Sequence, residues 1–310
     1  MGDLPIADLT SESAETRLQA TSAIADACER GTPLDAAAEP VIALLADPDS
    51  KVSGMAGYIL QTDAERDPSG RGAAALRAAL TSDVIAVRRG AATLLAGCLA
   101  REENGAAVAA LIDTPDPAVR LGAITALAEG ARPRAQIDAV VSSLVNALAD
   151  DELRVRKEAT WALYLFGSDG ADVQSAVPAL ERMLDDPSTQ GNAAIVISLA
   201  LHTANDATRA DALARHPSLL VQSGAAWGAA TVYLRRSDVA ALKTLFSSDS
   251  ADVRRGLGGY LHHARGRGRD LSPAGQAFLE LQRDHPDDAL LHARLFAVQE
   301  IIERGPPERS

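Results

Sequence analysis

The sequence predicts an all-α fold in which helical hairpins stack one after another into an α–α superhelix. Three observations favour this fold. A short pattern recurs along almost the whole chain at spacings between 32 and 37 residues. Hydrophobic residues make up 47% of the chain but aromatic residues only 3%, and such alanine-rich sequences suit closely packed helices better than sheets. A length of 310 residues also approaches the limit of a single compact core, which favours an elongated repeat structure.

The recurring pattern is clearest at Asp116-Pro117-Ala118-Val119-Arg120, where an apolar anchor follows an Asp/Pro turn. Further apolar residues follow each anchor at +4, +7 and +8, which predicts one buried stripe along a helix. Nine such copies at near-constant spacing indicate internal repeats. The anchors are Thr16, Val52, Val87, Val119, Val155, Thr189, Val221, Val253 and Leu290.

Each repeat is predicted to contain two helices, an A helix before the Asp/Pro turn and a B helix after it. Asp, Ser or Thr at the turn can cap the B helix, and proline suits its first turn. Proline also recurs within the A helices, at Pro40 and Pro178, where it should kink them. Glycine recurs at +3 from the anchor and predicts close contact between helices. These glycines are Gly90, Gly122, Gly224 and Gly256.

The pattern Asp-Pro-x-x-x-Val-Arg-x-x-Ala-x-x-Ala-Leu resembles the HEAT repeats, in particular the bacterial HEAT-like repeats of the bilin-lyase type. The resemblance covers roughly residues 11–304. It implies a right-handed solenoid of about nine helical hairpins that spans residues 1–310, with a degenerate first repeat at 11–30 and a disordered tail at 305–310. It also implies a bacterial source and a concave side lined by the B helices.

In such repeats, the arginine after the anchor commonly pairs with the turn aspartate of a neighbouring repeat. The resemblance therefore implies an Arg–Asp ladder along this chain. It is expected to lapse at Ser53, Gln190 and Gln222, where the arginine is missing. The expected members are Arg17, Arg88, Arg120, Arg156 and Arg254 with Asp116, Asp151 and Asp249.

The sequence shows no catalytic set, and we expect neither enzymatic activity nor a cofactor or metal. The adjacent His262 and His263 would face about 100° apart on a helix, which does not suit one metal ion. No glycine-rich phosphate loop follows a strand pattern. Cys28 and Cys98 lie two repeats apart, too far for a disulfide, and are expected to be small buried side chains.

The formal net charge is −12, which disfavours non-specific attraction to nucleic acid or to anionic lipid. The first ten residues lack the features of a signal peptide, and no apolar run approaches the length of a membrane span. A cytoplasmic location is therefore expected. One basic run, Arg265 to Arg269, could contact a phosphate, but it also fits a solvated loop between the eighth B helix and the ninth A helix.

The candidate binding residues lie mainly in the +6 column of the B helices, at or beyond the edge of the buried stripe. Both tryptophans of the chain fall in this column. We expect a groove centred on Trp161, Tyr164 and Trp227 with Arg156, Lys157 and Glu158 at one rim, because exposed aromatic residues often anchor binding patches. The alternative is that the aromatic rings fill gaps left by small residues. The column reads Ser22, Tyr58, Thr93, Thr125, Trp161, Ile195, Trp227, Gly259 and Phe296.

Three classes of function remain open. The first is a non-catalytic scaffold or adaptor that binds a protein partner on the B-helix face, and fold, charge and residue content favour it. The second is an enzyme accessory or a lyase-like HEAT protein, although no residue set for a chromophore pocket is evident. The third is a nucleic-acid-binding HEAT protein, which would need a stripe of Lys and Arg along the B helices. The partner's identity and the oligomeric state stay open.

Overall fold

The computed structural model describes residues 4–68 and 70–305. Within these ranges every regular element is a helix, and the hairpins form an α–α superhelix as predicted. The chain divides into two compact units, Met1–Ala162 and Leu163–Ser310, with the boundary inside one B helix. The disordered tail expected at 305–310 lies outside the described residues except for Gly305, and a single solenoid over 1–310 stays a prediction.

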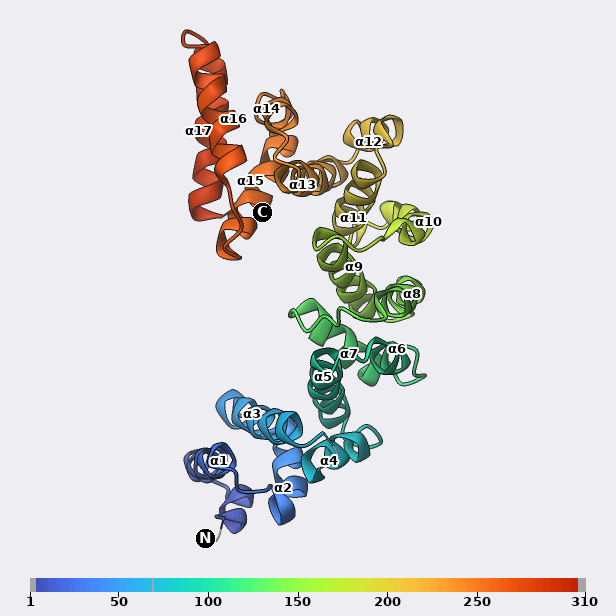
Figure 1. Ribbon diagram of the computed structural model, residues 1–310, viewed down its shortest axis with the longest axis vertical. Coiled ribbons are helices and arrows are strands. Elements are labelled where there is room, and N and C mark those ends of the chain that lie inside the picture. The colour runs from blue at the N-terminus through green and yellow to red at the C-terminus, as the bar shows by residue number, and fades with distance from the viewer. Residues whose placement is uncertain (1–3, 69, 306–310) are drawn as a thin grey trace. The chain divides into compact units, whose positions relative to one another are not determined.

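All nine predicted B helices are present in the described part of the chain, each preceded by its A segment (Figure 1). The A segments of the first unit are η1 (Ile6–Thr10), η2 (Asp35–Ala37) with α2 (Ala38–Ala43) and η3 (Leu44–Ala46), α4 (Arg71–Ala79), α6 (Gly105–Ile112) and α8 (Ile137–Ala147). The B helices are α1 (Ala14–Glu29), α3 (Ser50–Arg66), α5 (Ile85–Arg101), α7 (Pro117–Ala128) and α9 (Leu153–Ser168), which crosses the boundary.

The second unit continues the same alternation. Its A segments are η4 (Gln174–Ala176) with α10 (Val177–Arg182) and η5 (Met183–Asp185), α12 (Ala207–Ala214), α14 (Val239–Phe246) and α16 (Ser272–Asp284). Its B helices are α11 (Gln190–Thr203), α13 (Leu219–Arg235), α15 (Ala251–Gly266) and α17 (Ala289–Arg304).

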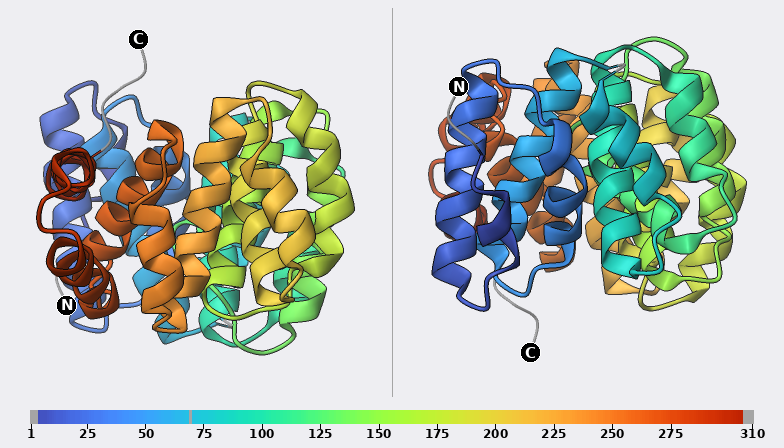
Figure 2. Two further views of the ribbon diagram at one scale, coloured as in Figure 1. Left: turned by 90° about the horizontal axis from the view of Figure 1, so that it is seen from above. Right: turned by 90° about the horizontal axis from the view of Figure 1, so that it is seen from below.

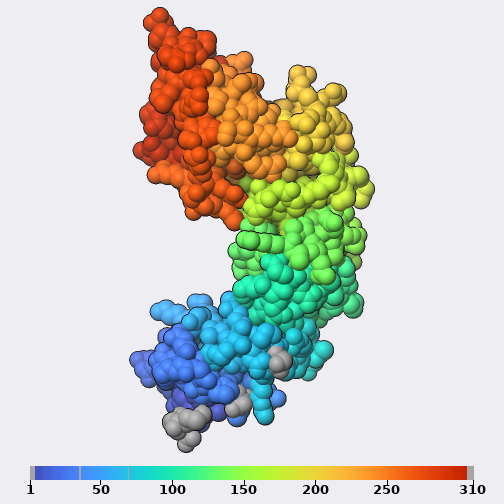
Figure 3. All heavy atoms as spheres, in the orientation of Figure 1, coloured from blue at the N-terminus to red at the C-terminus, as the bar shows by residue number. Residues whose placement is uncertain are grey.

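Each unit consists of two helical layers. In the first unit α1 packs on α3, α3 on α5 and α5 on α7, whereas α2 packs on α4 and α6 on α8. In the second unit α11, α13, α15 and α17 pack in that order, and α14 packs on α16. The two views of Figure 2 show neighbouring helices side by side, and Figure 3 shows the surface of the same stacks. The core therefore runs along the stack, as expected when no hairpin can bury its apolar face alone.

The turns begin the B helices as the sequence predicts. The side chain of Asp116 accepts hydrogen bonds from the backbone N–H groups of Ala118 and Val119, and Asp49 does the same at α3. Pro40 and Pro178 act differently from a simple kink. They lie in α2 and α10, which are short α-helical segments flanked by 3-10 turns. These segments are short because proline cannot donate the backbone hydrogen bond that would extend a regular helix.

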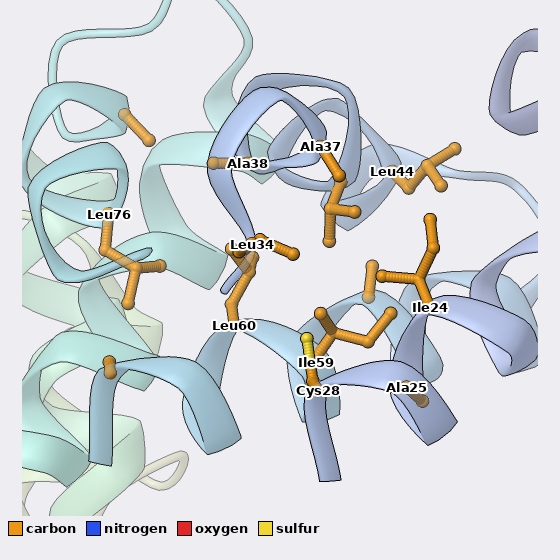
Figure 4. Close-up of a cluster of buried hydrophobic side chains, with 14 of the residues drawn as sticks. Ile24, Ala25, Cys28, Leu34, Ala37, Ala38, Leu44, Ile59, Leu60 and Leu76 are labelled. Atoms are coloured by element: carbon orange, nitrogen blue, oxygen red, sulfur yellow. The ribbon is translucent and has the colours of Figure 1, made fainter. Parts of the chain in front are cut away.

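The core of the first unit is aliphatic and alanine-rich. Ile24, Ile59 and Leu60 are fully buried, and Figure 4 shows them facing residues of the adjoining A segment. Cys28 joins this cluster as a buried free thiol, and Cys98 is likewise buried and free. Both cysteines therefore serve as small core residues, as the sequence indicates.

The ladder expected from the resemblance is present in the first unit. Arg17 forms two hydrogen bonds with Asp47, of 2.7 and 2.9 Å, and Arg88 pairs with Asp116 at 2.6 Å. Arg120 pairs with Asp150 at 2.6 Å rather than with the expected Asp151. Of the two adjacent carboxylates, Asp150 rather than Asp151 lies next to the guanidinium of Arg120. The repeat pattern alone does not determine which of the two forms the pair.

The same arginines also bind the backbone of their own turn. Arg120 donates to the carbonyl oxygen of Thr114, six residues earlier, and Arg156 donates to that of Asp150 at 2.7 Å. Where the arginine is missing, Gln222 donates to the carbonyl oxygen of His216 at 2.9 Å and accepts from the Ser250 hydroxyl at 3.0 Å. The expected lapse at Gln222 is therefore a neutral version of the same joint.

Glycine at +3 brings neighbouring B helices into close contact at three of the four predicted positions. A Cβ atom on Gly122, Gly224 or Gly256 would overlap a backbone carbonyl oxygen of the preceding B helix. Gly228, at +7, is equally tight against Ile195 of α11. Gly90 is the exception, because an added Cβ would meet only the Leu45 side chain, at 3.5 Å.

The ninth repeat is shifted by one residue from the prediction. Leu290, the expected anchor, is 62% exposed, whereas Leu291 is buried together with Leu295 and Val298. Phe296, expected in the +6 column, is consequently 61% exposed on the outer side of α17. Two adjacent leucines both satisfy the apolar pattern, and only packing against α15 distinguishes them.

Candidate functional site

An aromatic cluster lies in the second unit. It consists of Tyr164, Trp227, Tyr260 and His263, from α9, α13 and α15. The Trp227 ring is central, with centroids 6.2 Å from Tyr164, 6.0 Å from Tyr260 and 5.7 Å from His263. The two tyrosine contacts are edge-to-face, a favoured geometry for aromatic pairs.

Two arginines tie this cluster to the end of α9. Arg235 of α13 donates to the carbonyl oxygen of Gly167 at 3.0 Å. Arg269, which follows α15, pairs with Asp169 at 2.6 Å. Residues 169 and 269 are 100 positions apart, so this contact joins the end of the fifth repeat to the connection between the eighth and ninth. Solenoid repeats usually contact only their neighbours, and this contact therefore encloses a space between non-adjacent B helices.

That space is a cavity of about 250 Å³, here named the basic cavity. Its hydroxyl-bearing walls come from Tyr164, Tyr260 and Thr231, and its charged groups come from three arginines and one aspartate. The lining residues are Tyr164, Leu165, Ser168, Thr231, Leu234, Arg235, Ser237, Tyr260, His263, Ala264, Arg267, Arg269, Asp270 and Pro273.

Burial controls the protonation of the rings that line the cavity. It raises the pKa of Tyr164 and of Tyr260, which keeps both hydroxyls as hydrogen-bond donors at neutral pH. Burial also lowers the pKa of His263, and the positive charges of Arg267 and Arg269 lower it further. His263 is therefore neutral at pH 7, and the positive charge of the cavity comes from arginine.

Four of the residues expected to bind a partner belong to the first unit. Tyr58 is 47% exposed on α3, and its hydroxyl donates to the Glu29 carboxylate of α1 at 2.6 Å. Trp161 and Lys157 are half-buried on α9. Arg156 is also half-buried, and its guanidinium binds the backbone of its own turn.

The other two expected residues, Tyr164 and Trp227, belong to the second unit and lie together in the aromatic cluster. Tyr164 is only 2% exposed, and Trp227 is half-buried. Their rings thus fill space between helices, and Gly228 beside Trp227 allows the close approach of α11 and α13. Tyr164 nevertheless lines the basic cavity.

The sequence did not single out Arg235, Tyr260 and His263 as a set, because they lie on two helices and meet only in the folded chain. One signal was present in the sequence, namely the basic run from Arg265 to Arg269. This run is not a simple loop, because α15 extends through Gly266 and Arg269 is held by Asp169. Arg267 and Arg269 line the cavity, whereas Arg265 does not.

A second, wider cavity of about 600 Å³ lies in the first unit between the C-terminal ends of α3, α5 and α7. Arg101, Arg132 and Arg134 line it together with Glu103 and Glu129, so its lining carries one more cation than carboxylates. Arg101 is also paired with Glu65 of α3. The excess of positive charge in its lining is therefore smaller than in the lining of the basic cavity.

In the described part of the chain, no three His, Cys, Asp or Glu side chains are grouped as metal ligands. Within the same residues, no helix combines the length and apolarity that crossing a bilayer requires.

Residues 104–200 match the family model for HEAT repeats. No curated protein matches the chain. Among solved structures, an engineered protein is 23% identical with a TM-score of 0.48, covering 97% of this chain and 88% of its own. A designed armadillo repeat protein is 19% identical with a TM-score of 0.38, covering 64% and 100%. A computationally designed armadillo repeat protein for modular peptide recognition is 18% identical with a TM-score of 0.36, covering 62% and 97%.

Proposed function

Because the chain is a HEAT-repeat protein, we propose that it is a non-catalytic scaffold or adaptor that binds a protein partner on the face of its B helices. Repeats of this kind offer an extended surface rather than a single deep active site. In the proposal, the B-helix face of the first unit carries Tyr58, Trp161, Arg156 and Lys157, and the B-helix face of the second unit carries Trp227 with Tyr164 beside it.

Tyr58 is the observation that supports the proposal best. Its ring is 47% exposed, yet its hydroxyl is fixed by the Glu29 carboxylate. An aromatic ring held in place before binding loses little conformational entropy when it contacts a partner. Tyrosine and tryptophan are also enriched among the residues that contribute most to protein–protein binding.

The proposal is tested by affinity capture from a lysate of the source organism with wild-type protein, Tyr58→Ala and Leu279→Ala. Leu279 is a matched control, because it is 65% exposed but lies on the A helix α16. Loss of a Tyr58 anchor should reduce recovery of the captured protein about tenfold or more, whereas Leu279→Ala should leave it unchanged. Equal recovery with all three proteins would contradict binding on the B-helix face.

A further inference from the structure

The charged side chains that line the basic cavity are mostly hydrogen-bond donors. Arg235, Arg267 and Arg269 donate only, and the hydroxyls of Tyr164 and Tyr260 stay protonated because burial raises the pKa of each. Asp270 is the one carboxylate in the lining, and it already accepts from the backbone N–H and the hydroxyl of Ser272. A ligand that complements this cavity must therefore supply several acceptor oxygens.

The charge of the cavity points the same way. Three arginines and one aspartate line it, which gives a net charge of +2 from the lining residues, or +1 when the Asp169 carboxylate beside Arg269 is included, while the whole chain carries −12. Arg269 is paired with Asp169. Among the residues that the structure describes, neither Arg235 nor Arg267 forms an ion pair with a carboxylate. The charges of these two guanidinium groups are thus not neutralised by a paired carboxylate, although Arg235 donates to the carbonyl oxygen of Gly167 and to the hydroxyl of Thr203.

The size of the cavity limits the ligand. Pockets for drug-sized ligands usually measure about 300–1,000 Å³, and the basic cavity is slightly smaller at about 250 Å³. It suits one compact anionic group with a small attached moiety. Tyr164 and Tyr260 line it, and aromatic residues favour contact with a planar or apolar attachment.

We propose that the basic cavity binds the dianionic phosphate of a phosphate monoester. A monoester presents three strong acceptor oxygens and nearly two negative charges at neutral pH, which matches both the excess of donors and the lining charge of +2. The planar guanidinium of Arg267 is the group most open to the phosphate, because Arg267 is exposed and lies at the C-cap of α15. Arg235 and the hydroxyl of Tyr260 line the same cavity and supply further donors. The proposal goes beyond the scaffold function and holds whether or not a protein binds to the B-helix face.

The test is titration calorimetry together with ³¹P line broadening, with inorganic phosphate, N-acetyl-O-phosphotyrosine amide and N-acetyl-tyrosine amide as probes. Wild-type protein should bind both phosphate probes saturably and should not bind the unphosphorylated amide. Tighter binding of the phosphotyrosine probe would indicate that the phosphate arrives on a larger molecule. Equal binding of the two would indicate that free phosphate is sufficient.

Arg267→Gln should weaken phosphate binding at least tenfold, whereas Arg265→Gln is the matched control. Arg265 is exposed in the same segment but does not line the cavity. Both changes remove one exposed positive charge, so a general electrostatic effect would weaken phosphate binding equally in the two variants. Absence of saturable binding to either phosphate probe, or equal weakening by the two variants, would overturn the proposal. Neither outcome would affect partner capture through Tyr58, so the two proposals fail separately.

Discussion

The guanidinium of Arg269 lies 2.6 Å from the carboxylate of Asp169, and this pair joins residues that the repeat architecture places three repeats apart. The two side chains are 49% and 38% exposed, so the pair itself contributes little to the free energy of unfolding. Its importance is geometric, because it brings the connection after α15 to the end of α9 and so helps to enclose the basic cavity.

Asp169→Asn should strengthen phosphate binding, because the amide oxygen of asparagine can still accept a hydrogen bond from Arg269 and so keep the cavity enclosed. The change removes the carboxylate that neutralises Arg269, and it raises the net charge beside the cavity by one. Loss of one negative charge this close to the cavity strengthens the attraction between the cavity and the phosphate. We expect the phosphate affinity to rise about fivefold at low salt. The matched control is Asp211→Asn on α12, which changes the net charge equally but lies outside the cavity lining. Titration with inorganic phosphate measures the effect. Identical phosphate affinities for the two variants would contradict a contribution of Arg269 to phosphate binding.

Trp227→Ala should destabilise the second unit. Trp227 is half-buried and touches three other rings of the aromatic cluster, and its truncation should cost about 2 kcal/mol or more. Phe296→Ala provides the comparison, because Phe296 is 61% exposed and its loss should change stability by less than about 0.5 kcal/mol. Urea unfolding followed by circular dichroism measures both. Similar midpoints for the two variants would show that Trp227 does not hold the cluster together.

Gly228→Ala and Gly90→Ala should have opposite effects. A methyl group on Gly228 would overlap the Ile195 carbonyl oxygen and force α13 away from α11, an overpacking change that costs about 1–3 kcal/mol. A methyl group on Gly90 would meet only the Leu45 side chain, at an ordinary van der Waals distance. Alanine there should stabilise α5 by up to about 1 kcal/mol through its higher helix propensity. Thermal unfolding of the two variants tests the difference. If both variants were less stable than wild type, a close helix contact at Gly228 but not at Gly90 would be contradicted.

The stability of the first unit should fall in acid through Asp47. Hydrogen bonds from Arg17 lower the pKa of Asp47 in the folded protein. The folded state then binds fewer protons than the unfolded state, whose aspartate has a pKa of about 3.9. The stabilisation is complete above that value and is lost as the pH falls through the lower, folded pKa.

This pH dependence is measured by comparing Asp47→Asn with wild type at pH 7, 4 and 3. The variant should be less stable than wild type at pH 7. The difference between their free energies of unfolding should become smaller as the pH falls through the folded pKa of Asp47. Asp26→Asn, at an exposed site on α1, controls for the general loss of a carboxylate. A gap that stays constant with pH would mean that Asp47 is not the titrating group.

The repeat pattern predicted the B helices well because its signal is local. An apolar residue at 0, +4, +7 and +8 determines which side of a helix is buried, and Val52, Val119 and Val155 are all buried accordingly. The prediction missed by one residue where the signal is degenerate, at Leu290 and Leu291. The choice there depends on packing against the neighbouring helix, which periodicity does not contain.

The candidate site was predictable only in part. Position in the +6 column identified Trp227, and sequence proximity to Trp161 drew attention to Tyr164. The basic cavity could not be predicted, because it depends on contacts such as Arg269 with Asp169 across 100 positions. A repeat sequence specifies how each hairpin meets the next one, whereas contact between distant repeats results from many small rotations added together.

Gln222 shows what the joint between repeats requires. One side chain must reach back to the carbonyl oxygen of its own turn and forward to the next turn, and glutamine does this with Ser250 where arginine does it with aspartate. Exchanging a single partner leaves either an unmatched charge or an unfilled hydrogen bond. These joints can therefore change in evolution only as coupled pairs, and a duplicated hairpin that carries both halves of its pair can be added to the array without altering its neighbours.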